Sequence, residues 1–478
     1  MERSSLATGR WRNRPLDGIS PDMKSLYSGA DIEGLLEKLL QAPVDPQQPF
    51  LYQKDSREDV YTMAGRLYAA FVEMGSEVPI CLAAEERSVI AAALLAAMAS
   101  GKILVLPHSF SESALEQMRQ VTGFTSAVVD VEREFLPDIQ CISSERKGGT
   151  VSLPVKNISE DAELLRIFTG GSTGSPKIWS KTAGNIFGEA WFMASRYQIT
   201  NQDIILSTVS PYHIYGLLFS IVIPLVSSAA VLAETPSFPA EITEAVEQNS
   251  ATVLVSVPAH YRVLRGRSVG TSLRVAFSSA GMLEETDSLE FSASNDIGVV
   301  EVYGSTETGG LASRDRSVGQ KFFTPLEPVI WRIAEERLYV QSPFLSPDLP
   351  VNGDGFFLSG DRVQQEGAAG FSLHGRADAI TKVGGVRVDI DEVRDFIQSQ
   401  AAVQECVVVS LADKGGRGNL IAALVRGEGL DLDNLKKVLT GGLEPAAMPK
   451  RIRVVSAIPV MPNGKYDREA ICKLFTSL

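Results

Sequence analysis

The sequence predicts an α/β protein with a large domain of mostly parallel, helix-covered sheets over residues 1–374 and a small α+β domain over residues 375–478. Three observations predict it. The 478 residues are 44% hydrophobic and 22% charged, which is typical of globular proteins and excludes disordered and fibrous ones. Short apolar runs alternate with helical patterns in the first part, which is the rhythm of βαβ units. The pattern changes near Gly375, and about 100 residues follow, a normal size for a small domain.

In the large domain, short runs rich in Val, Ile and Leu predict buried strands, and longer patterns predict helices. The strands are predicted at Val78–Ala83, Lys102–Leu106, Ser126–Val129, Ile204–Val209, Thr252–Val257, Arg274–Phe277 and Gly298–Val302. The helices are predicted at Arg87–Ala99, Ala240–Gln248 and His260–Leu264. Sites are expected where such strands end and loops begin.

The small domain has a mixed order of helices and strands rather than a βαβ alternation. Its helices are predicted at Asp391–Gln400 and Leu432–Leu439, and its strands at Gln404–Leu411, Asn419–Val425 and Ile452–Ser456. This order predicts an α+β module.

One apolar stretch approaches the length of a membrane span. No Asp, Glu, Lys or Arg occurs between Ile204 and Ala233, but Pro224 and several serines interrupt the run. Because a span needs about 20 apolar residues with charged flanks, we expect a buried helix followed by a buried strand instead.

Charge and cysteine content narrow the class of partner and the compartment. The net charge of −13 gives no general field for nucleic acid or anionic lipid, so no nucleic-acid partner is expected. The four cysteines, Cys81, Cys141, Cys406 and Cys472, are far apart in sequence, which favours neither disulfides nor a zinc site and fits a reducing compartment. With no apolar signal segment at the N-terminus, a cytoplasmic location is expected.

The segment TGGSTGSPK, Thr169 to Lys177, follows a predicted strand and could hold phosphate. Its glycines let the backbone wrap closely around an anion, its hydroxyls and N–H groups can donate to phosphate oxygens, and Lys177 supplies a positive charge. The spacing differs from that of a P-loop, and on composition alone a flexible linker fits equally well.

Four later segments carry further polar residues in a fixed order. EVYGSTETGG places Glu307 beside Thr306 after a strand, where a carboxylate could hold Mg²⁺. DGFFLSGD ends in Asp361, GRADAITKVGGVRVDIDEV begins at Gly375, and PNGKYDR carries Lys465 on a turn. Taken singly, Asp361 and Arg376 could form a surface ion pair, and Lys465 could be a solvated lysine.

Together, in order and spacing, these segments resemble the adenylate-forming superfamily of acyl- and aryl-CoA synthetases, peptide-synthetase adenylation domains and luciferases, from about Leu164 to Arg468. The resemblance implies an ATP- and Mg²⁺-dependent reaction and a small domain that rotates about a hinge at Asp378. It implies that the ATP phosphates are held by Thr169, Gly170, Gly171, Ser172, Thr173, Gly174 and Lys177. It also implies a pantetheine passage along Lys382, Gly384 and Gly385.

The same resemblance implies roles for the other motif residues. In Tyr303-Gly304-Ser305-Thr306-Glu307, the tyrosine would stack on adenine, Thr306 would touch the α-phosphate and Glu307 would hold Mg²⁺. The segment Ser279-Ala280-Gly281 would line adenine and the acyl pocket. Asp361 would bind the ribose hydroxyls with Arg376 as its helper, and Lys465 would bridge the attacking carboxylate and the α-phosphate.

The segment PYHIYG, residues 211–216, falls where the superfamily has its acid-pocket motif. His213 lies between Tyr212 and Tyr215, and no acidic residue follows before Glu234. An amino-acid substrate is therefore disfavoured unless another segment supplies a carboxylate. His213 is either a packed histidine or a pocket residue that takes part in catalysis, and aryl acids and short or medium fatty acids both fit.

These expectations add up to an ATP-dependent acid–thiol ligase, which adenylates a small carboxylic acid and passes the acyl group to CoA or to the phosphopantetheine of an acyl carrier protein. One alternative is a stand-alone adenylation domain that loads only a carrier protein. Another is a catalytically silent nucleotide-binding sensor, which the intact Lys465, Glu307 and Asp361 argue against.

Overall fold

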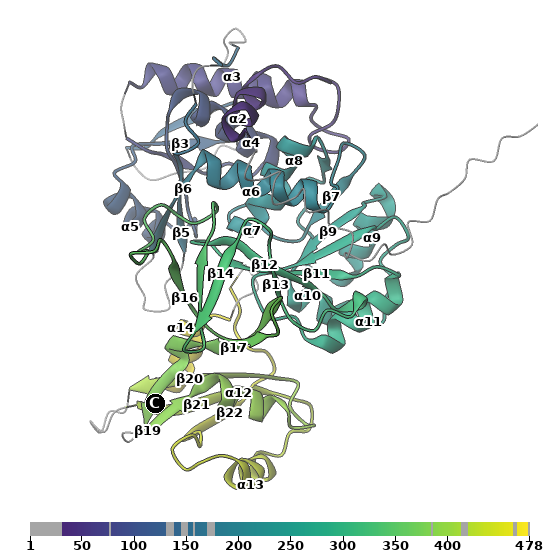
Figure 1. Cartoon of the computed structure of the whole chain (residues 1–478), viewed down its shortest axis with the longest axis vertical. Coiled ribbons are helices and arrows are strands. Elements are labelled where there is room, and N and C mark those ends of the chain that lie inside the picture. The colour runs from purple at the N-terminus through teal and green to yellow at the C-terminus, as the bar shows by residue number, and fades with distance from the viewer. Residues whose placement is uncertain are drawn as a thin grey trace, which may run out of the picture.

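The computed structural model describes residues 31–75, 78–130, 138–144, 152–155, 158–169, 177–383, 386–412, 419–461 and 466–476, without the side chains of residues 378, 380, 382, 387 and 476. A large α/β body holds the N-terminal three quarters of the chain, and a small unit lies at one end of it (Figure 1). The predicted fold class is confirmed. The boundary at residue 375 stays a prediction, although strand β17 (Gly370–Arg376) ends beside it.

The first sheet of the large body has six strands. In spatial order they are β4 (Gln140–Ser143), β3 (Ser126–Val129), β1 (Ile80–Leu82), β2 (Leu104–Leu106), β5 (Glu163–Thr169) and β6 (Lys177–Thr182). All neighbours pair in parallel except β5 and β6. Its helices are α2 (Ile32–Leu40), α3 (Arg57–Glu73), α4 (Arg87–Ser100), α5 (Glu112–Thr122) and α6 (Ala183–Arg196). Strands β1, β2 and β3 are buried along their whole length, as expected of parallel strands covered on both faces.

The second sheet has seven strands. In spatial order they are β13 (Thr324–Pro325), β12 (Gly309–Asp315), β11 (Val299–Ser305), β10 (Val275–Ser278), β9 (Val253–Ser256), β7 (Ile204–Ser207) and β8 (Ala230–Val231). The last five are parallel, and β12 and β13 are antiparallel additions. The helical segments around it are α7 (Ile214–Leu217), η2 (Leu218–Val222), α8 (Ile223–Ser227), α9 (Pro239–Asn249), α10 (Pro258–Val263), α11 (Glu285–Asn295) and η3 (Arg316–Val318).

The apolar stretch that approached spanning length is part of this second layer. It forms the consecutive segments α7, η2 and α8 and then strand β8, all buried at most positions. In the part of the chain that the structure describes, no helix is long and apolar enough to cross a membrane. The expected buried helix followed by a buried strand is therefore confirmed.

Residues 330–376 differ from the predicted parallel pattern. They form a four-stranded antiparallel sheet of β14 (Ile330–Ala334), β15 (Arg337–Gln341), β16 (Phe357–Glu366) and β17. Along β14, exposed and half-buried positions alternate instead of forming a buried apolar run, because one face of such a sheet contacts water. This alternation gave no buried-strand signal in the sequence.

The small unit is built on two further sheets. They contain the strands β18 (Ile380–Val383), β19 (Val386–Asp389), β20 (Glu405–Ala412), β21 (Asn419–Arg426) and β22 (Arg451–Val454). The helices are α12 (Ile390–Gln398), α13 (Leu432–Gly442) and α14 (Arg468–Thr476), and the short turn η4 (Ala377–Ala379) leads into the unit from β17. One apolar cluster packs α12 and α13 on one face of β20 and β21, and a second packs α14 on the other.

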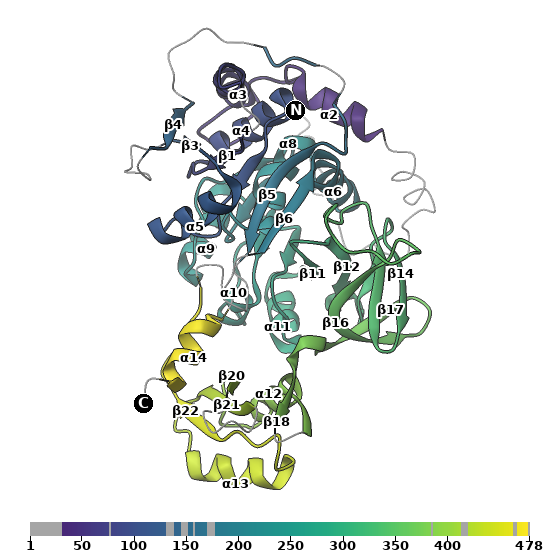
Figure 2. The ribbon, with the colours of Figure 1, turned by 90° about the vertical axis from the view of Figure 1, so that its left-hand side faces the viewer.

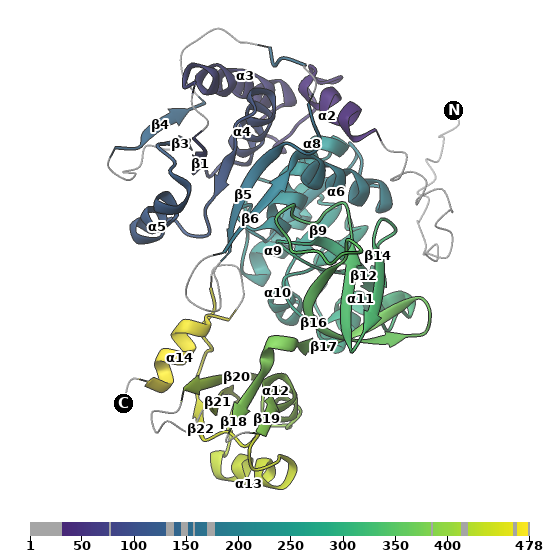
Figure 3. The same cartoon turned by 60° about the vertical axis from the view of Figure 1, so that its left-hand side comes forward.

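The small unit contacts the large body at a few polar positions, and all views show it at the same end (Figures 2 and 3). Arg362 of β16 donates a hydrogen bond to Asp389 at the end of β19. Arg262 of α10 lies 3.9 Å from the carboxylate of Glu405 on β20, to which Tyr466 also donates a hydrogen bond of 2.9 Å. Such sparse polar contacts are typical of units that move relative to each other.

An ion pair between the buried Asp203 and the exposed Arg274 ties the end of α6 to the second sheet. Asp203, at the start of β7, accepts two hydrogen bonds of 2.7 and 2.8 Å from Arg274 and one of 2.7 Å from Thr252. Arg274 also donates to the carbonyls of Tyr197 and Gln198 just after α6. One carboxylate and one guanidinium therefore join the starts of β7, β9 and β10 to the end of a helix.

We predict that Asp203→Asn lowers the free energy of unfolding by about 1–3 kcal/mol, because the buried side chain loses the charge that strengthens its hydrogen bonds to Arg274 and Thr252. Burial raises the pKa of Asp203, but the hydrogen bonds and charge of its partners outweigh it, so the net pKa is lower than usual. The ionised Asp203 therefore stabilises the folded protein at pH values above the pKa that this carboxyl group has in the unfolded chain. This stabilisation is lost as the pH falls through the lower pKa that the group has in the folded protein. In urea unfolding, the difference in free energy of unfolding between wild type and variant should become smaller below about pH 4.

The matched control is Asp354→Asn, since Asp354 forms an exposed ion pair with Arg332. That change should cost less than about 1 kcal/mol. A loss for Asp203→Asn no larger than the loss for Asp354→Asn would contradict the role assigned to the buried Asp203 carboxylate.

Candidate active site

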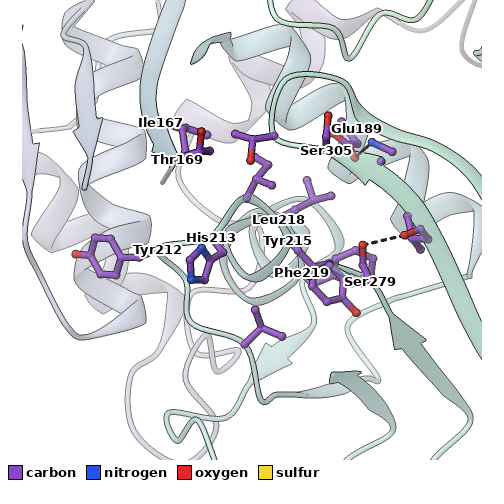
Figure 4. Close-up of a pocket in the computed structure, with 18 of the residues that line it drawn as sticks. Ile167, Thr169, Glu189, Tyr212, His213, Tyr215, Leu218, Phe219, Ser279 and Ser305 are labelled. Atoms are coloured by element: carbon purple, nitrogen blue, oxygen red, sulfur yellow. Dashed lines mark hydrogen bonds between the residues drawn. The ribbon is translucent and has the colours of Figure 1, made fainter. Parts of the chain in front are cut away.

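A cavity lies where β5, β10 and β11 end and where α7 and η2 begin (Figure 4). Its described lining residues are Ile167, Phe168 and Thr169 of β5; His108, Glu189, Val209, Tyr212 and His213; Ile214, Tyr215, Leu218 and Phe219; Ser279 and Ala280; Val302, Gly304, Ser305, Thr306, Gly309 and Gly310; and Met461. The carboxyl ends of parallel strands are where α/β proteins bind ligands. Most of the predicted motifs therefore converge on one place.

The acid-pocket motif forms one wall of the cavity. His213 caps the start of α7, and its ring faces the cavity in Figure 4. Tyr215 packs edge-on against Phe219, with ring centroids 5.2 Å apart, and its hydroxyl donates to the carbonyl of Ser256. Burial raises the pKa of Tyr215 well above its ordinary value, so the phenol stays neutral. This wall is aromatic, and its Tyr215 is neutral.

The chain between α7 and α8 forms a π-helical turn, η2, which carries Leu218 and Phe219 into the cavity. Turns of this kind insert an extra residue into a helix and are frequent at functional sites. Phe219 also contacts Phe277 of β10, with centroids 4.7 Å apart. The turn thus connects the cavity wall to the core of the second sheet.

The segment Ser279-Ala280-Gly281 follows β10, and its first two residues line the cavity. Ser279 donates a hydrogen bond of 2.8 Å to the carbonyl of Val302. Ala280 has a φ of 69°, in the left-handed region that non-glycine residues seldom adopt. Such strained residues cluster at binding sites, where the surrounding structure holds them in place.

The turn between β11 and β12 carries Thr306 and Glu307. Gly304 is needed here, since a Cβ atom at this position would lie 2.2 Å from the carbonyl oxygen of Gly309. Ser305 and Thr308 exchange hydrogen bonds across the turn. Thr306 faces the cavity, as its predicted contact with a phosphate requires.

Two buried residues that no sequence motif predicted, Lys181 and Glu189, form hydrogen bonds with the backbone at the two ends of this turn. Lys181 of β6 donates to the carbonyls of Phe344, at 2.7 Å, and Glu307, at 3.2 Å. Glu189 of α6 accepts a hydrogen bond of 2.7 Å from the amide of Gly310. The only sequence signal for Glu189 was an acidic residue in the otherwise apolar run IFGEAWFM.

The electrostatics of this pair follow from burial. Burial lowers the pKa of Lys181 to about 8, against the opposing charge of Glu189, Glu307 and Asp348. Burial raises the pKa of Glu189, while the charge of Lys181 and the amide of Gly310 lower it. Burial is the largest effect on both residues and favours their neutral forms, and the charge of each partner opposes it.

A second group of predicted residues lies beside the cavity rather than in its described lining. The hydroxyl of Tyr303 donates a short hydrogen bond of 2.6 Å to Asp361, which lies 3.9 Å from Arg376. The Tyr303 ring packs against Phe323 and Phe371, with centroids 5.8 and 5.7 Å away. The predicted pairing of Asp361 and Arg376 is therefore present, and Tyr303 joins it.

The remaining predicted residues fall into two groups. Lys177 begins β6 with an exposed side chain, and Gly281 is exposed next to the cavity; neither belongs to the described lining. Outside the described residues, or without a described side chain, lie Gly170, Gly171, Ser172, Thr173, Gly174, Asp378, Lys382, Gly384, Gly385 and Lys465. Their roles stay predictions. Met461, which precedes Lys465 by four residues, lines the cavity.

The residues present fit a Mg²⁺ ion that is bound together with a nucleotide. The Glu307 carboxylate is half-buried at the turn beside Thr306, and carboxylate oxygen is the ligand that Mg²⁺ prefers. Among the described residues, no group of three or more His, Cys, Asp or Glu side chains could hold a metal. Mg²⁺ in nucleotide enzymes is commonly held by one or two carboxylates plus phosphate oxygens, so one carboxylate is enough.

Comparisons with known proteins agree with this geometry. Over 347 residues the chain is 29% identical to the p-hydroxybenzoic acid–AMP ligase FadD22 of Mycobacterium tuberculosis, covering 66% of this chain but only 49% of that ligase, so the match spans about half the length of this relative. It is 24% identical to the indoleacetate–CoA ligase of Aromatoleum aromaticum, covering 69% of this chain and 70% of that enzyme.

A solved structure and two family models cover more of the chain. The O-succinylbenzoate CoA synthetase of Bacillus subtilis in complex with AMP has the same fold, with a TM-score of 0.77, 18% identity and coverage of 91% of this chain and 97% of that one. Residues 50–330 match the model of the AMP-binding enzyme family, and residues 392–465 match the model of its C-terminal domain. The chain therefore belongs to the AMP-binding enzyme family, which confirms the adenylate-forming superfamily that its motifs resemble.

Proposed function

We propose that this protein is an ATP-dependent acid–thiol ligase, which adenylates a small carboxylic acid and transfers the acyl group to the thiol of CoA or of a phosphopantetheine arm. The observation that carries the proposal is that a site suited to an acid lies next to a site suited to a nucleotide. An apolar cavity with aromatic walls, fit for the acid, adjoins the Thr306 turn and the Tyr303–Asp361 pair, which are fit for a nucleotide.

The cavity favours a small acid, and an aryl acid most. Its volume is about 190 Å³, and an apolar cavity of about 150 Å³ can hold benzene. The named relatives act on p-hydroxybenzoic acid and indoleacetate, both aryl acids. These two observations favour the aryl alternative over a fatty acid.

In the first half-reaction, a carboxylate oxygen of the acid attacks the α-phosphorus of ATP and pyrophosphate leaves. Two anions must approach each other, so positive charge and hydrogen-bond donors at the α-phosphate govern the rate. The Thr306 hydroxyl would donate to an α-phosphate oxygen, and Lys465 would contact both anions. Mg²⁺ held by Glu307 would supply further positive charge at the phosphates.

In the second half-reaction, the thiol attacks the acyl carbonyl and AMP leaves. Lys465 must move away to open a path, and the sparse polar contacts of the small unit, such as Arg262 with Glu405, are compatible with rotation about Asp378. Lys382, Gly384 and Gly385 would then line the path of the pantetheine arm.

We predict that the protein exchanges radioactive pyrophosphate into ATP in the presence of an aryl acid. Adenylation is reversible, so exchange needs the acid but no thiol. The measurement is a panel of benzoic, phenylacetic, cinnamic, short fatty and amino acids, with and without Mg²⁺. Tight nucleotide binding without exchange for any acid would instead indicate the nucleotide-binding sensor.

We predict that Lys465→Ala slows acid-dependent pyrophosphate exchange by about 100-fold or more, because one preorganised donor at a developing charge contributes that much. Thioester formation from a supplied acyl-adenylate should change little, since Lys465 acts only in the first step. The control is Lys450→Ala, an exposed lysine of the same unit. Equal loss of both half-reactions would contradict this assignment.

We predict that Asp361→Asn raises the KM for ATP about tenfold or more and leaves the KM for the acid unchanged. A carboxylate accepts strong hydrogen bonds from ribose hydroxyls, and an amide accepts weaker ones. Tyr303→Phe is the matched control, because it removes the hydrogen bond to Asp361 and keeps the ring. The ribose role would be wrong if Asp361→Asn left the KM for ATP unchanged.

A further inference from the structure

Glu189 is the one carboxylate among the described residues that line the cavity. It is fully buried on helix α6, and Figure 4 shows it above Leu218, on the same side as Ser305. Apolar side chains surround most of the same cavity. A buried carboxylate is costly in such a place unless hydrogen bonds and charge compensate it.

The protein supplies a hydrogen bond to one of the two carboxylate oxygens of Glu189. Oxygen Oε1 accepts from the amide of Gly310, and Oε2 lies beside Gly309, where a Cβ atom would come within 2.6 Å of it. Among the described residues, none donates a hydrogen bond to Oε2. An ionised carboxylate can accept several hydrogen bonds, so capacity remains on the side of the cavity.

A cation lies near Glu189. The charge of Lys181 lowers the pKa of this carboxyl group, against the larger opposite effect of burial, and the Lys181 ammonium donates its hydrogen bonds to the carbonyls of Glu307 and Phe344. A ligand ammonium near Glu189 would therefore meet the field of a second cation. The carboxylate of the substrate would be repelled by Glu189 and belongs near Thr306, where the phosphate must lie.

We propose that Glu189 is a specificity-determining residue of the acid pocket, which selects carboxylic acids that carry a neutral hydrogen-bond donor, a hydroxyl or an uncharged amino group, away from the reacting carboxylate. The proposal rests on the ligase function and adds the substrate class to it. An acid without such a donor leaves Oε2 unpaired in a dry site, and sites of this kind reject such analogues strongly.

The first test compares matched acids on the wild-type protein. Hydroxybenzoates and aminobenzoates are compared with methylbenzoates at the ortho, meta and para positions, because the three substituents have similar size. We expect kcat/KM in pyrophosphate exchange to be about 10- to 100-fold higher for the best donor acid than for its methyl counterpart. Phenylalanine, whose only donor away from the carboxylate is its α-ammonium group, tests the ammonium alternative and should be a poor substrate.

The second test changes the chemistry of Glu189. In Glu189→Gln, the amide oxygen would replace Oε1 opposite Gly310, which turns the NH₂ group toward the cavity. Hydroxyl acids, which can also accept, should keep most of their activity, whereas aminobenzoates should lose about tenfold or more. In the double variant Lys181→Met with Glu189→Leu, both charges are removed together, and methylbenzoates should become the preferred acids.

The matched control is Glu301→Gln. Glu301 is also buried, is paired with Arg314 and Arg316, and lies outside the cavity lining. This variant tests whether lost stability alone changes specificity, and its ratio of donor to methyl acids should equal that of the wild type.

The outcomes separate this proposal from the ligase function. Exchange with methylbenzoates that equals exchange with donor acids would overturn the role of Glu189 and leave the ligase function standing. Preference for amino acids over hydroxybenzoates would overturn it in favour of ammonium recognition. If no acid supports exchange, the ligase function fails, and calorimetric binding of hydroxy- and methylbenzoates then tests the donor preference alone, with equal affinities refuting it.

Discussion

The site depends on one buried pair of opposite charges. Lys181 holds the carbonyl of Glu307, and Glu189 holds the amide of Gly310, so the two residues fix both ends of the turn that carries Thr306. Both come from the continuous segment β6–α6. This segment begins at Lys177, the last residue of the predicted phosphate segment.

Such a pair is an expensive way to gain stability. Taking two charges out of water costs several kcal/mol each, and apolar residues of the same size often serve a fold equally well. A role in the cavity explains the presence of Lys181 and Glu189 better than a contribution to stability does. Opposite charges hold the turn at a defined position, and a carboxylate edge remains for a ligand. The Asp203–Arg274 pair has a different task, since it joins strand starts at the opposite end of β7.

The acid cavity and the nucleotide side of the site are held by different parts of the fold. The acid cavity rests on the packed core, where η2 and Phe219 contact the second sheet. The nucleotide side rests on antiparallel strands, through Asp361 of β16 and the Tyr303 hydrogen bond. The small unit touches the large body through a few ion pairs and through Met461 at the cavity. In our proposal, a rigid acid site and a mobile lysine serve the two half-reactions in turn.

The sequence by itself determined the parallel strands and the motifs, because a buried strand is a local apolar run and a motif is a local order of residues. It predicted Ser126–Val129 to the residue, and it predicted that His213, Ser279 and Thr306 belong to one site. It did not reveal the antiparallel sheet of residues 330–376, whose strands alternate and resemble exposed loops. Only the tertiary structure assigned Lys181 and Glu189, since their partners lie 126 and 121 residues away and no local pattern encodes a contact at that distance.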